Sequence, residues 1–198
     1  YGGAGEGNPG KYDKEMSRFL SESGKQLDEG LKKYLAARLA DRASTRQIEA
    51  GKAAFEHFLK IVRVRSDRGM GKRGKPLVPR ELFLMASKQV FDQHGRFLAY
   101  LNATYSKEER QKLPPKQRPT FNLQMIQDGH AVSLLIYANV PSPVDLKLVR
   151  DAVRKARTAK RGFWAQGDRT LLPYEFRWIV DTIRGKRKGP DRHCGDIT

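Results

Sequence analysis

The chain has 198 residues, with 39 Lys and Arg against 22 Asp and Glu, which gives a formal charge of +17 and a pI near 10.2. No apolar run approaches the roughly 20 residues that a membrane-spanning helix needs. The single cysteine, Cys194, excludes an internal disulfide and a thiolate metal cluster. A positive charge of this size attracts polyanions, and nucleic acid is the first expectation.

Residues 1–10 are rich in glycine and are predicted to form a loop. Apolar residues then recur at helical spacing, first over 12–20 and again over 27–39. Gly24 and Gly30 weaken the middle of this stretch, because glycine is a poor helix former. The pattern therefore predicts two helices or one bent helix, whose apolar side packs against the rest of the protein.

The next predicted helix runs from about 45 to 62. Ser44 or Thr45 is expected to cap its free backbone N–H groups. Its predicted buried side consists of Ile48, Ala54, Phe55, Phe58, Leu59 and Val62.

A basic segment with regularly placed glycines follows, and residues 63–75 are predicted to form a loop. It contains Arg63, Arg65, Lys72 and Arg73 as predicted substrate-binding residues. Such a loop suits a phosphate backbone, and its binding would weaken steeply as salt rises. A solvated loop without a ligand fits the same composition, so both interpretations stay open.

A β-hairpin is predicted within residues 76–103. Apolar residues alternate on both sides of the turn Asp92-Gln-His-Gly95, and Gly95 stands where a positive φ is easiest. Arg96 is the first residue after the turn. A guanidinium at this corner suits a phosphate held by two parallel hydrogen bonds, although the turn alone favours an ordinary surface arginine.

The remainder is predicted to alternate between connections and further elements. These are a surface connection over 104–119, a short helix over 122–131, a β-prone run over 132–140, an amphipathic helix that ends at 162–164, and a C-terminal helix within 171–183 before a basic tail. The polar face of the amphipathic helix carries Arg150, Arg154, Lys155, Arg157, Lys160 and Arg161. That face suits a polyanion, although a charged helix face is more often merely solvated.

Three blocks in this order carry a resemblance: Asp92-Gln-His-Gly-Arg96-Phe-Leu-Ala-Tyr100, Asn122-Leu-Gln-Met-Ile-Gln-Asp-Gly129-His-Ala131, and Ala152-Val-Arg-Lys-Ala156-Arg-Thr-Ala-Lys-Arg-Gly162-Phe-Trp164. Their order and spacing resemble successive blocks of the staphylococcal nuclease-like (thermonuclease) family. The resemblance covers about residues 45–166.

The resemblance implies an α+β fold. This fold is an OB-type β-barrel, partial in this chain, with three helices, and helices are added at both ends. The expected domains are a loop and helical segment over 1–44, the nuclease-like domain over 45–170, and a C-terminal helix with a basic tail over 171–198.

The resemblance also implies the hydrolysis of phosphodiester bonds in DNA or RNA, with calcium and little sequence preference. Arg96 matches an arginine of the family's site, where it would stabilise the transition state. Tyr137 matches a tyrosine that packs on the bound nucleotide. His94 stands where the family has a tyrosine that lines the phosphate pocket.

The family's calcium ligands, catalytic glutamate and second arginine lie around an Arg-x-x-Gly-Ile-Asp-x-Pro-Glu motif, which this chain lacks. No metal ligand is therefore identified. We favour the interpretation that the missing strands precede Tyr1 in the encoded protein, because half a barrel leaves open sheet edges. A degenerate member without metal site or base is the alternative. A non-catalytic nucleic-acid-binding module of the same fold, and an interaction protein whose charge is incidental, are the other functional hypotheses.

Overall fold

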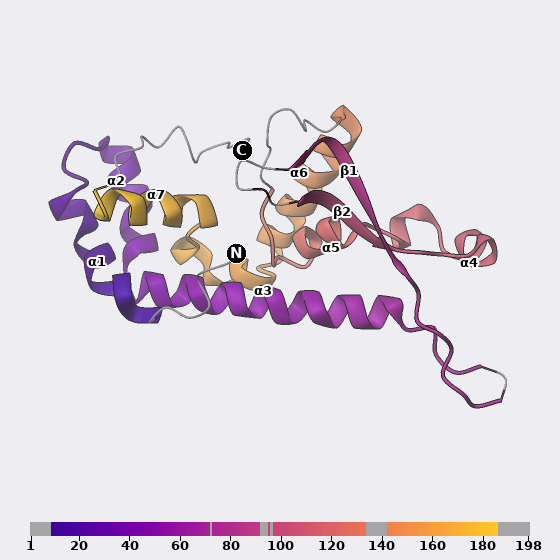
Figure 1. Cartoon of the computed structure of the whole chain (residues 1–198). Coiled ribbons are helices and arrows are strands. Elements are labelled where there is room, and N and C mark those ends of the chain that lie inside the picture. Colours follow the sequence, from indigo (N-terminus) through magenta and orange to yellow (C-terminus); the bar gives the residue numbers. More distant parts are fainter. Residues whose placement is uncertain (1–8, 72, 92–94, 96, 134–141, 186–198) are drawn as a thin grey trace. The chain divides into compact units, whose positions relative to one another are not determined.

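The computed structural model describes residues 9–71, 73–91, 95, 97–133 and 142–185. Its elements in chain order (Figure 1) are η1 (Pro9–Tyr12), α1 (Asp13–Glu22), α2 (Glu29–Leu39), α3 (Ala43–Ser66), β1 (Leu82–Phe91), β2 (Phe97–Ala103), α4 (Lys107–Lys112), η2 (Pro115–Gln117), α5 (Phe121–Gln127), α6 (Pro143–Thr158), η3 (Gly162–Arg169) and α7 (Pro173–Ile183). The chain divides into two compact units, which are described one at a time. Unit 1 comprises residues 1–53 and 157–198, and unit 2 comprises residues 54–156. The domain bounds predicted at 44 and 170 stay a prediction.

The two N-terminal helices are separate, as the sequence allows. The side chain of Asp28 caps α2, because it accepts hydrogen bonds from the backbone N–H groups of Gly30 and Leu31 at 2.7 and 3.3 Å. Helices and strands occur in the same chain, which confirms the mixed helix and strand content.

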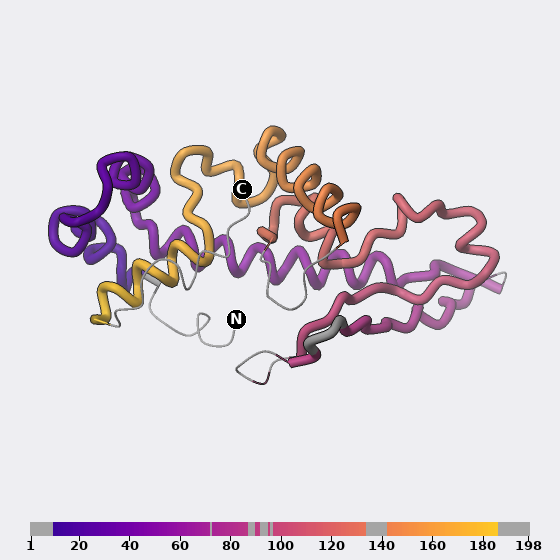
Figure 2. Tube along the Cα trace, turned by 90° about the horizontal axis from the view of Figure 1, so that it is seen from above, coloured from indigo at the N-terminus to yellow at the C-terminus, as the bar shows by residue number. Residues whose placement is uncertain are grey.

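Unit 1 is held together by a core that joins the two ends of the sequence. Figure 2 shows α7, in yellow, beside the indigo helices α1 and α2. The rings of Phe19 and Trp178 meet edge to face, with centres 5.7 Å apart. The buried members of this core are Met16, Phe19, Leu35, Leu39, Ala43, Leu171, Trp178 and Ile179. The N-terminal helices and the C-terminal helix therefore form one packed structure.

The start of α3 differs from the predicted cap. The helix begins at Ala43, so Ser44 and Thr45 lie inside its first turn instead of before it. The backbone N–H and the hydroxyl of Thr45 both donate to the carboxylate of Asp13, with a backbone N···O distance of 3.0 Å. The acceptor at this helix start thus comes from α1, 32 residues earlier in the chain.

Arg46 stabilises the turn between α2 and α3. Asp41 and Arg42 have φ values of 48° and 58°, in the left-handed region that residues with a side chain seldom adopt. The guanidinium of Arg46 donates to the backbone carbonyls of Arg38, Ala40 and Asp41. These bonds satisfy carbonyl groups that the end of α2 leaves without helical partners.

Unit 2 contains the predicted hairpin. Strands β1 and β2 pair antiparallel from Leu82↔Ala103 onward and again at Phe91↔Phe97, with a register shift between Ala86 and Phe91. Gly95 has a φ of 72°, as predicted for the turn. In the described residues the sheet has two strands and is not closed, so the OB-type barrel is not confirmed. Residues 134–140 of the predicted β-prone run lie outside the described part of the chain.

The side chain of Asn122 holds α5 against the edge of β2 that does not pair with β1. Its Nδ2 donates to the carbonyl of Ala99 at 3.3 Å, and its Oδ1 accepts from the N–H of Leu101 at 2.9 Å. One amide thus satisfies one donor and one acceptor on that edge of the strand. Gly129, with a φ of 76°, follows Asp128, the C-cap of α5.

The guanidinium of Arg65, on the last turn of α3, lies at the centre of unit 2. Its Nη2 donates to Asn102 Oδ1 at 2.6 Å and to the hydroxyl of Tyr105 at 3.1 Å. Its Nη1 donates to Gln124 Oε1 at 3.0 Å. The same group lies over the ring of Phe121, with the guanidinium carbon 4.2 Å from the ring centre. The adjacent buried core consists of Ile61, Ala103 and Phe121.

Several predicted boundaries are wrong. The amphipathic helix, α6, ends at Thr158 and not at 162–164. Helix α3 continues to Ser66, so Arg63 and Arg65 lie on its last turn and not in a loop. The connection over 104–119 contains α4, which starts with a capping box. Ser106 accepts from the N–H of Glu109, while the Glu109 carboxylate accepts from the N–H of Ser106 at 2.9 Å.

Among the described residues, no helix has both the length and the apolar character that crossing a membrane requires.

Replacing Arg65 with methionine is expected to lower the free energy of unfolding by about 2–3 kcal/mol, because three polar partners lose their hydrogen bonds in a partly buried site. Chemical denaturation with circular dichroism measures the change. Arg63→Met is the matched control, since Arg63 is exposed on the same turn and is expected to change the value by less than about 0.5 kcal/mol. Equal effects of the two substitutions would contradict the role given to Arg65.

Candidate functional site

The last pair of the hairpin ladder fixes both ends of the segment that carries the predicted arginine. Phe91 pairs with Phe97, and their rings meet at 5.7 Å with an interplanar angle of 65°. The ladder has a register shift before this pair, and a shift of this kind bends and twists a strand. Such bulges are often found next to active sites. The described ladder thus ends at the Phe91–Phe97 pair, next to the predicted turn.

Four predicted site residues, Arg96, His94, Tyr137 and Lys72, lie outside the described residues. The roles given to them therefore stay predictions.

The other three predicted site residues are described, and they have different surroundings. Arg63 and Arg73 are exposed. Arg65 is half-buried, and its guanidinium donates to Asn102, Tyr105 and Gln124. The structure therefore leaves Arg63 and Arg73 accessible to a polyanion, while the donors of Arg65 serve partners within the protein. Substrate binding by any of the three stays a prediction.

The basic segment after α3 has a folded backbone around residues 69–77. The N–H of Gly71 donates to the carbonyl of Lys75 at 2.8 Å, and the N–H of Leu77 donates to the carbonyl of Gly69 at 2.9 Å. Met70 and Pro76 form an isolated antiparallel bridge. The segment projects from the rest of unit 2 (Figure 1). Arg73 is presented on this hairpin-like segment.

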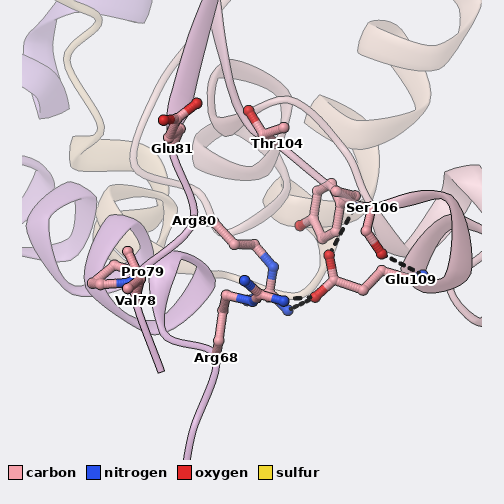
Figure 3. Close-up of a pocket in the computed structure, with 9 residues that line it drawn as sticks. Arg68, Val78, Pro79, Arg80, Glu81, Thr104, Ser106 and Glu109 are labelled. Atoms are coloured by element: carbon pink, nitrogen blue, oxygen red, sulfur yellow. Dashed lines mark hydrogen bonds and ion pairs between the residues drawn. The ribbon is translucent and has the colours of Figure 1, made fainter. Parts of the chain in front are cut away.

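A pocket of about 320 Å³ lies at the other end of the β1–β2 ladder. Its lining (Figure 3) consists of Arg68, Val78, Pro79, Arg80, Glu81, Thr104, Tyr105, Ser106 and Glu109. Figure 3 shows the Arg68 and Arg80 side chains directed toward Glu109. The distances are 2.7 Å from Arg80 Nη2 to Glu109 Oε1 and 3.9 Å from Arg68 Nε to the same oxygen.

The charges of this pocket stabilise one another. The pKa of Glu109 lies below its ordinary value, first because the N–H of Ser106 donates to the carboxylate and then because Arg80 donates to it. Arg80 also donates to the carbonyls of Arg65 and Asp67, where α3 ends. The hydrogen bonds of Arg80 and its ion pair with Glu109 thus connect the end of α3 to the start of α4.

The pocket is remote from the predicted site at the hairpin turn. Glu81 in the pocket directly precedes β1, whose ten residues end at Phe91. At a rise of about 3.3 Å per residue, the two ends of this strand are about 30 Å apart. The carboxylates of the pocket therefore lie far from Phe91, the last residue of β1 before the predicted turn.

A second polar cluster joins α3 to the end of α5. His57 Nε2 lies 2.9 Å from a carboxylate oxygen of Asp128. The rings of His57 and His130 stack, with centres 4.3 Å apart and an interplanar angle of 21°. Burial, and next the proximity of His57, hold the pKa of His130 below its ordinary value of 6.5, while Asp128 acts in the opposite direction.

The described residues do not fit a metal centre. Among them, no three His, Cys, Asp or Glu side chains lie close enough together to hold an ion. The calcium that the family resemblance implies stays a prediction, and no chemical step is assigned to it.

Sequence reasoning missed both clusters. The Ser106-to-Glu109 spacing is a recognisable capping box, and it places Glu109 at a helix start. Nothing in the sequence shows that Arg80 meets this carboxylate, or that His57 meets Asp128, because these pairs are 29 and 71 residues apart.

Comparison with families of known proteins finds a match over residues 72–166 to the family described as "Staphylococcal nuclease homologue". This range includes the hairpin, α4, α5 and α6. No curated protein and no solved structure matches the chain.

The low pKa of His130 predicts that the protein becomes less stable in acid. The unfolded chain, in which this histidine titrates near 6.5, takes up a proton more readily than the folded chain. The contribution is therefore present above pH 6.5 and is lost as the pH falls below it. We expect a lower urea midpoint at about pH 5.5 than at about pH 7.5, and a smaller difference in His130→Gln. An unchanged difference in this variant would exclude His130 as the cause.

Proposed function

Residues 72–166 of this chain belong to the staphylococcal nuclease homologue family, and from this we propose that the protein is a nuclease that hydrolyses phosphodiester bonds in DNA or RNA. The match to the family is the observation that carries the proposal. The range contains the complete hairpin and the segment with Arg96, so it covers the part of the sequence where the reacting phosphate is expected to bind.

The geometry of the hairpin supports a site at its turn. The Phe91–Phe97 pair closes the ladder on both sides of residues 92–96, and Gly95 adopts the positive φ that allows a tight turn. Arg96 directly precedes β2 in the sequence, and its contact with the phosphate stays part of the proposal.

The charge of the protein supports a polyanionic substrate. A formal charge of +17 concentrates nucleic acid around the molecule and accelerates encounter, more so at low ionic strength. Arg63 and Arg73 are exposed in unit 2 and add to this attraction. Contacts to phosphates carry no sequence information, which agrees with little sequence preference.

The proposed role of Arg96 follows from the chemistry of the reaction. When water or hydroxide attacks the phosphorus, negative charge grows on the oxygens that do not leave. A guanidinium directed at these oxygens stabilises the transition state more than the ground state. Arginine does not act as the general base, because it remains protonated throughout the accessible pH range. The described residues identify no base, and Arg96 is therefore assigned electrostatic stabilisation alone.

Replacing Arg96 with alanine is expected to lower the rate of hydrolysis by about 10²–10³-fold, because one preorganised donor to the transition state is lost. The rate is measured on plasmid DNA and on RNA, with and without a chelator, which also tests the predicted calcium dependence. Arg110→Ala is the matched control, since Arg110 is an exposed arginine of α4.

Three other outcomes would change the proposal. Full activity of Arg96→Ala would show that this arginine is not part of the site. An equal loss in Arg110→Ala would indicate a general charge effect. Binding of nucleic acid without hydrolysis by the unmodified protein would identify a binding module and not a nuclease.

A further inference from the structure

Helix α6 has one side that faces the protein and one side that is basic. Ala152 and Ala156 are buried, at 5% and 0% exposure. Lys147, Arg150 and Arg154 are exposed. At about 100° per residue, these three lie within an arc of about 60°, on the side of the helix opposite the two alanines. We call these three residues the α6 stripe.

The α6 stripe presents its charges to solvent. The side chains of Arg150 and Arg154 are 71% and 70% exposed. Asp151 is the acidic residue beside them, with distances of 3.8 Å to Arg150 Nε and 3.3 Å to Arg154 Nη2. Because this one carboxylate pairs with two of the three cations, the stripe keeps a net positive charge. Exposed pairs of this kind are worth little and are readily exchanged for another anion.

The spacing of the stripe suits a chain of phosphates. Its members are separated by three and four residues, so successive charges rise by about 5–6 Å along the helix axis. Lys155 lies about 100° around the helix from Arg154 and is outside the stripe. Arg157 is also excluded, because its guanidinium lies over the ring of Trp164 at 5.8 Å. A nucleic-acid strand repeats one negative charge per nucleotide, and three cations in a row can follow consecutive or alternate phosphates without reading the bases.

We propose that the α6 stripe is a second nucleic-acid contact, which binds the phosphate backbone of a single strand of DNA or RNA outside the site of hydrolysis. The proposal rests on the proposed function for the choice of nucleic acid as the partner. Hairpin and stripe then act together. The hairpin turn holds the reacting phosphate, and the stripe holds a flanking part of the same strand. A substrate too short to reach both the hairpin turn and the α6 stripe is expected to bind more weakly than a long one.

The test is a charge reversal with a matched control. One variant carries Lys147→Glu, Arg150→Glu and Arg154→Glu. The control carries Lys107→Glu, Lys112→Glu and Lys116→Glu, which are exposed lysines of unit 2 and give the same change in net charge. Binding to a fluorescent single-stranded DNA of about 20 nucleotides is measured over a series of salt concentrations. Circular dichroism verifies that both variants are folded.

We expect the stripe variant to bind about 10–100-fold more weakly than the control. We also expect its slope of log K against log salt to fall by about 2, since three phosphate contacts release about 0.7 counterion each on a single strand. The neutral variant Lys147→Gln, Arg150→Gln, Arg154→Gln is expected to lie between the two, and it separates lost contacts from added repulsion.

The failure of this inference differs from the failure of the proposed function. If the unmodified protein binds no nucleic acid, the proposed function is wrong. If it binds and the stripe variant equals the control in affinity and slope, the α6 stripe is not a contact. A loss of binding to vesicles with anionic lipid, with DNA binding unchanged, would assign the stripe to a membrane surface and overturn the inference.

Discussion

Unit 2 depends on one guanidinium. Arg65 reaches from the end of α3 to Asn102 at the end of β2, to Tyr105 in the following connection and to Gln124 on α5. Few side chains have enough donors in a fixed plane to join three partners, and lysine, with a compact ammonium group, does not reproduce this geometry. The contact with Phe121 places the charge over an aromatic face. The orientation of the hairpin relative to α3 and α5 follows from these bonds.

A second arginine repeats this arrangement nearby. Arg80 donates to the carbonyls at the end of α3 and pairs with Glu109 at the start of α4. In this strongly basic protein, two arginines of unit 2 thus act within the fold, where they satisfy helix ends and polar side chains. Net charge alone does not tell which arginines remain for a ligand. Burial and hydrogen bonding separate Arg65 and Arg80 from Arg63 and Arg73, which stay accessible.

Periodicity predicted most of the elements, because it records which side of a helix or strand is apolar. Helices α1, α2, α3, α5, α6 and α7 and the hairpin appear close to the expected ranges. The predictions that were wrong concern residues whose surroundings depend on contacts between distant parts of the chain. Thr45 looks like a helix cap, yet its donors go to Asp13. Arg65 looks like a loop residue that meets phosphate, yet Asn102 and Gln124 engage it. The Ser106-to-Glu109 spacing is typical of a capping box, although the prolines of the 104–119 connection favour an irregular segment.

In the candidate site, too, neighbouring residues predict the local backbone but not the contacts with distant parts of the chain. The turn at Gly95 follows from residue types over a few positions, and its positive φ is confirmed. Whether a carboxylate stands opposite Arg96 depends on strands that no local pattern locates. The family match over residues 72–166 supplies a relationship for this part of the chain, and the described residues supply no metal ligands. The family relationship is therefore shown for this part of the chain, while the catalytic reaction stays a proposal.

The amide of Asn122 has a consequence for self-association. A strand edge with unpaired N–H and C=O groups is a template on which another chain can add a strand. On β2 the carbonyl of Ala99 and the N–H of Leu101 are both engaged by one side chain, within the same stretch of strand. An incoming strand that paired there would have to displace this amide and break the contact between α5 and β2. Asn122 therefore occupies, in this stretch of β2, the donor and the acceptor that a further strand would need.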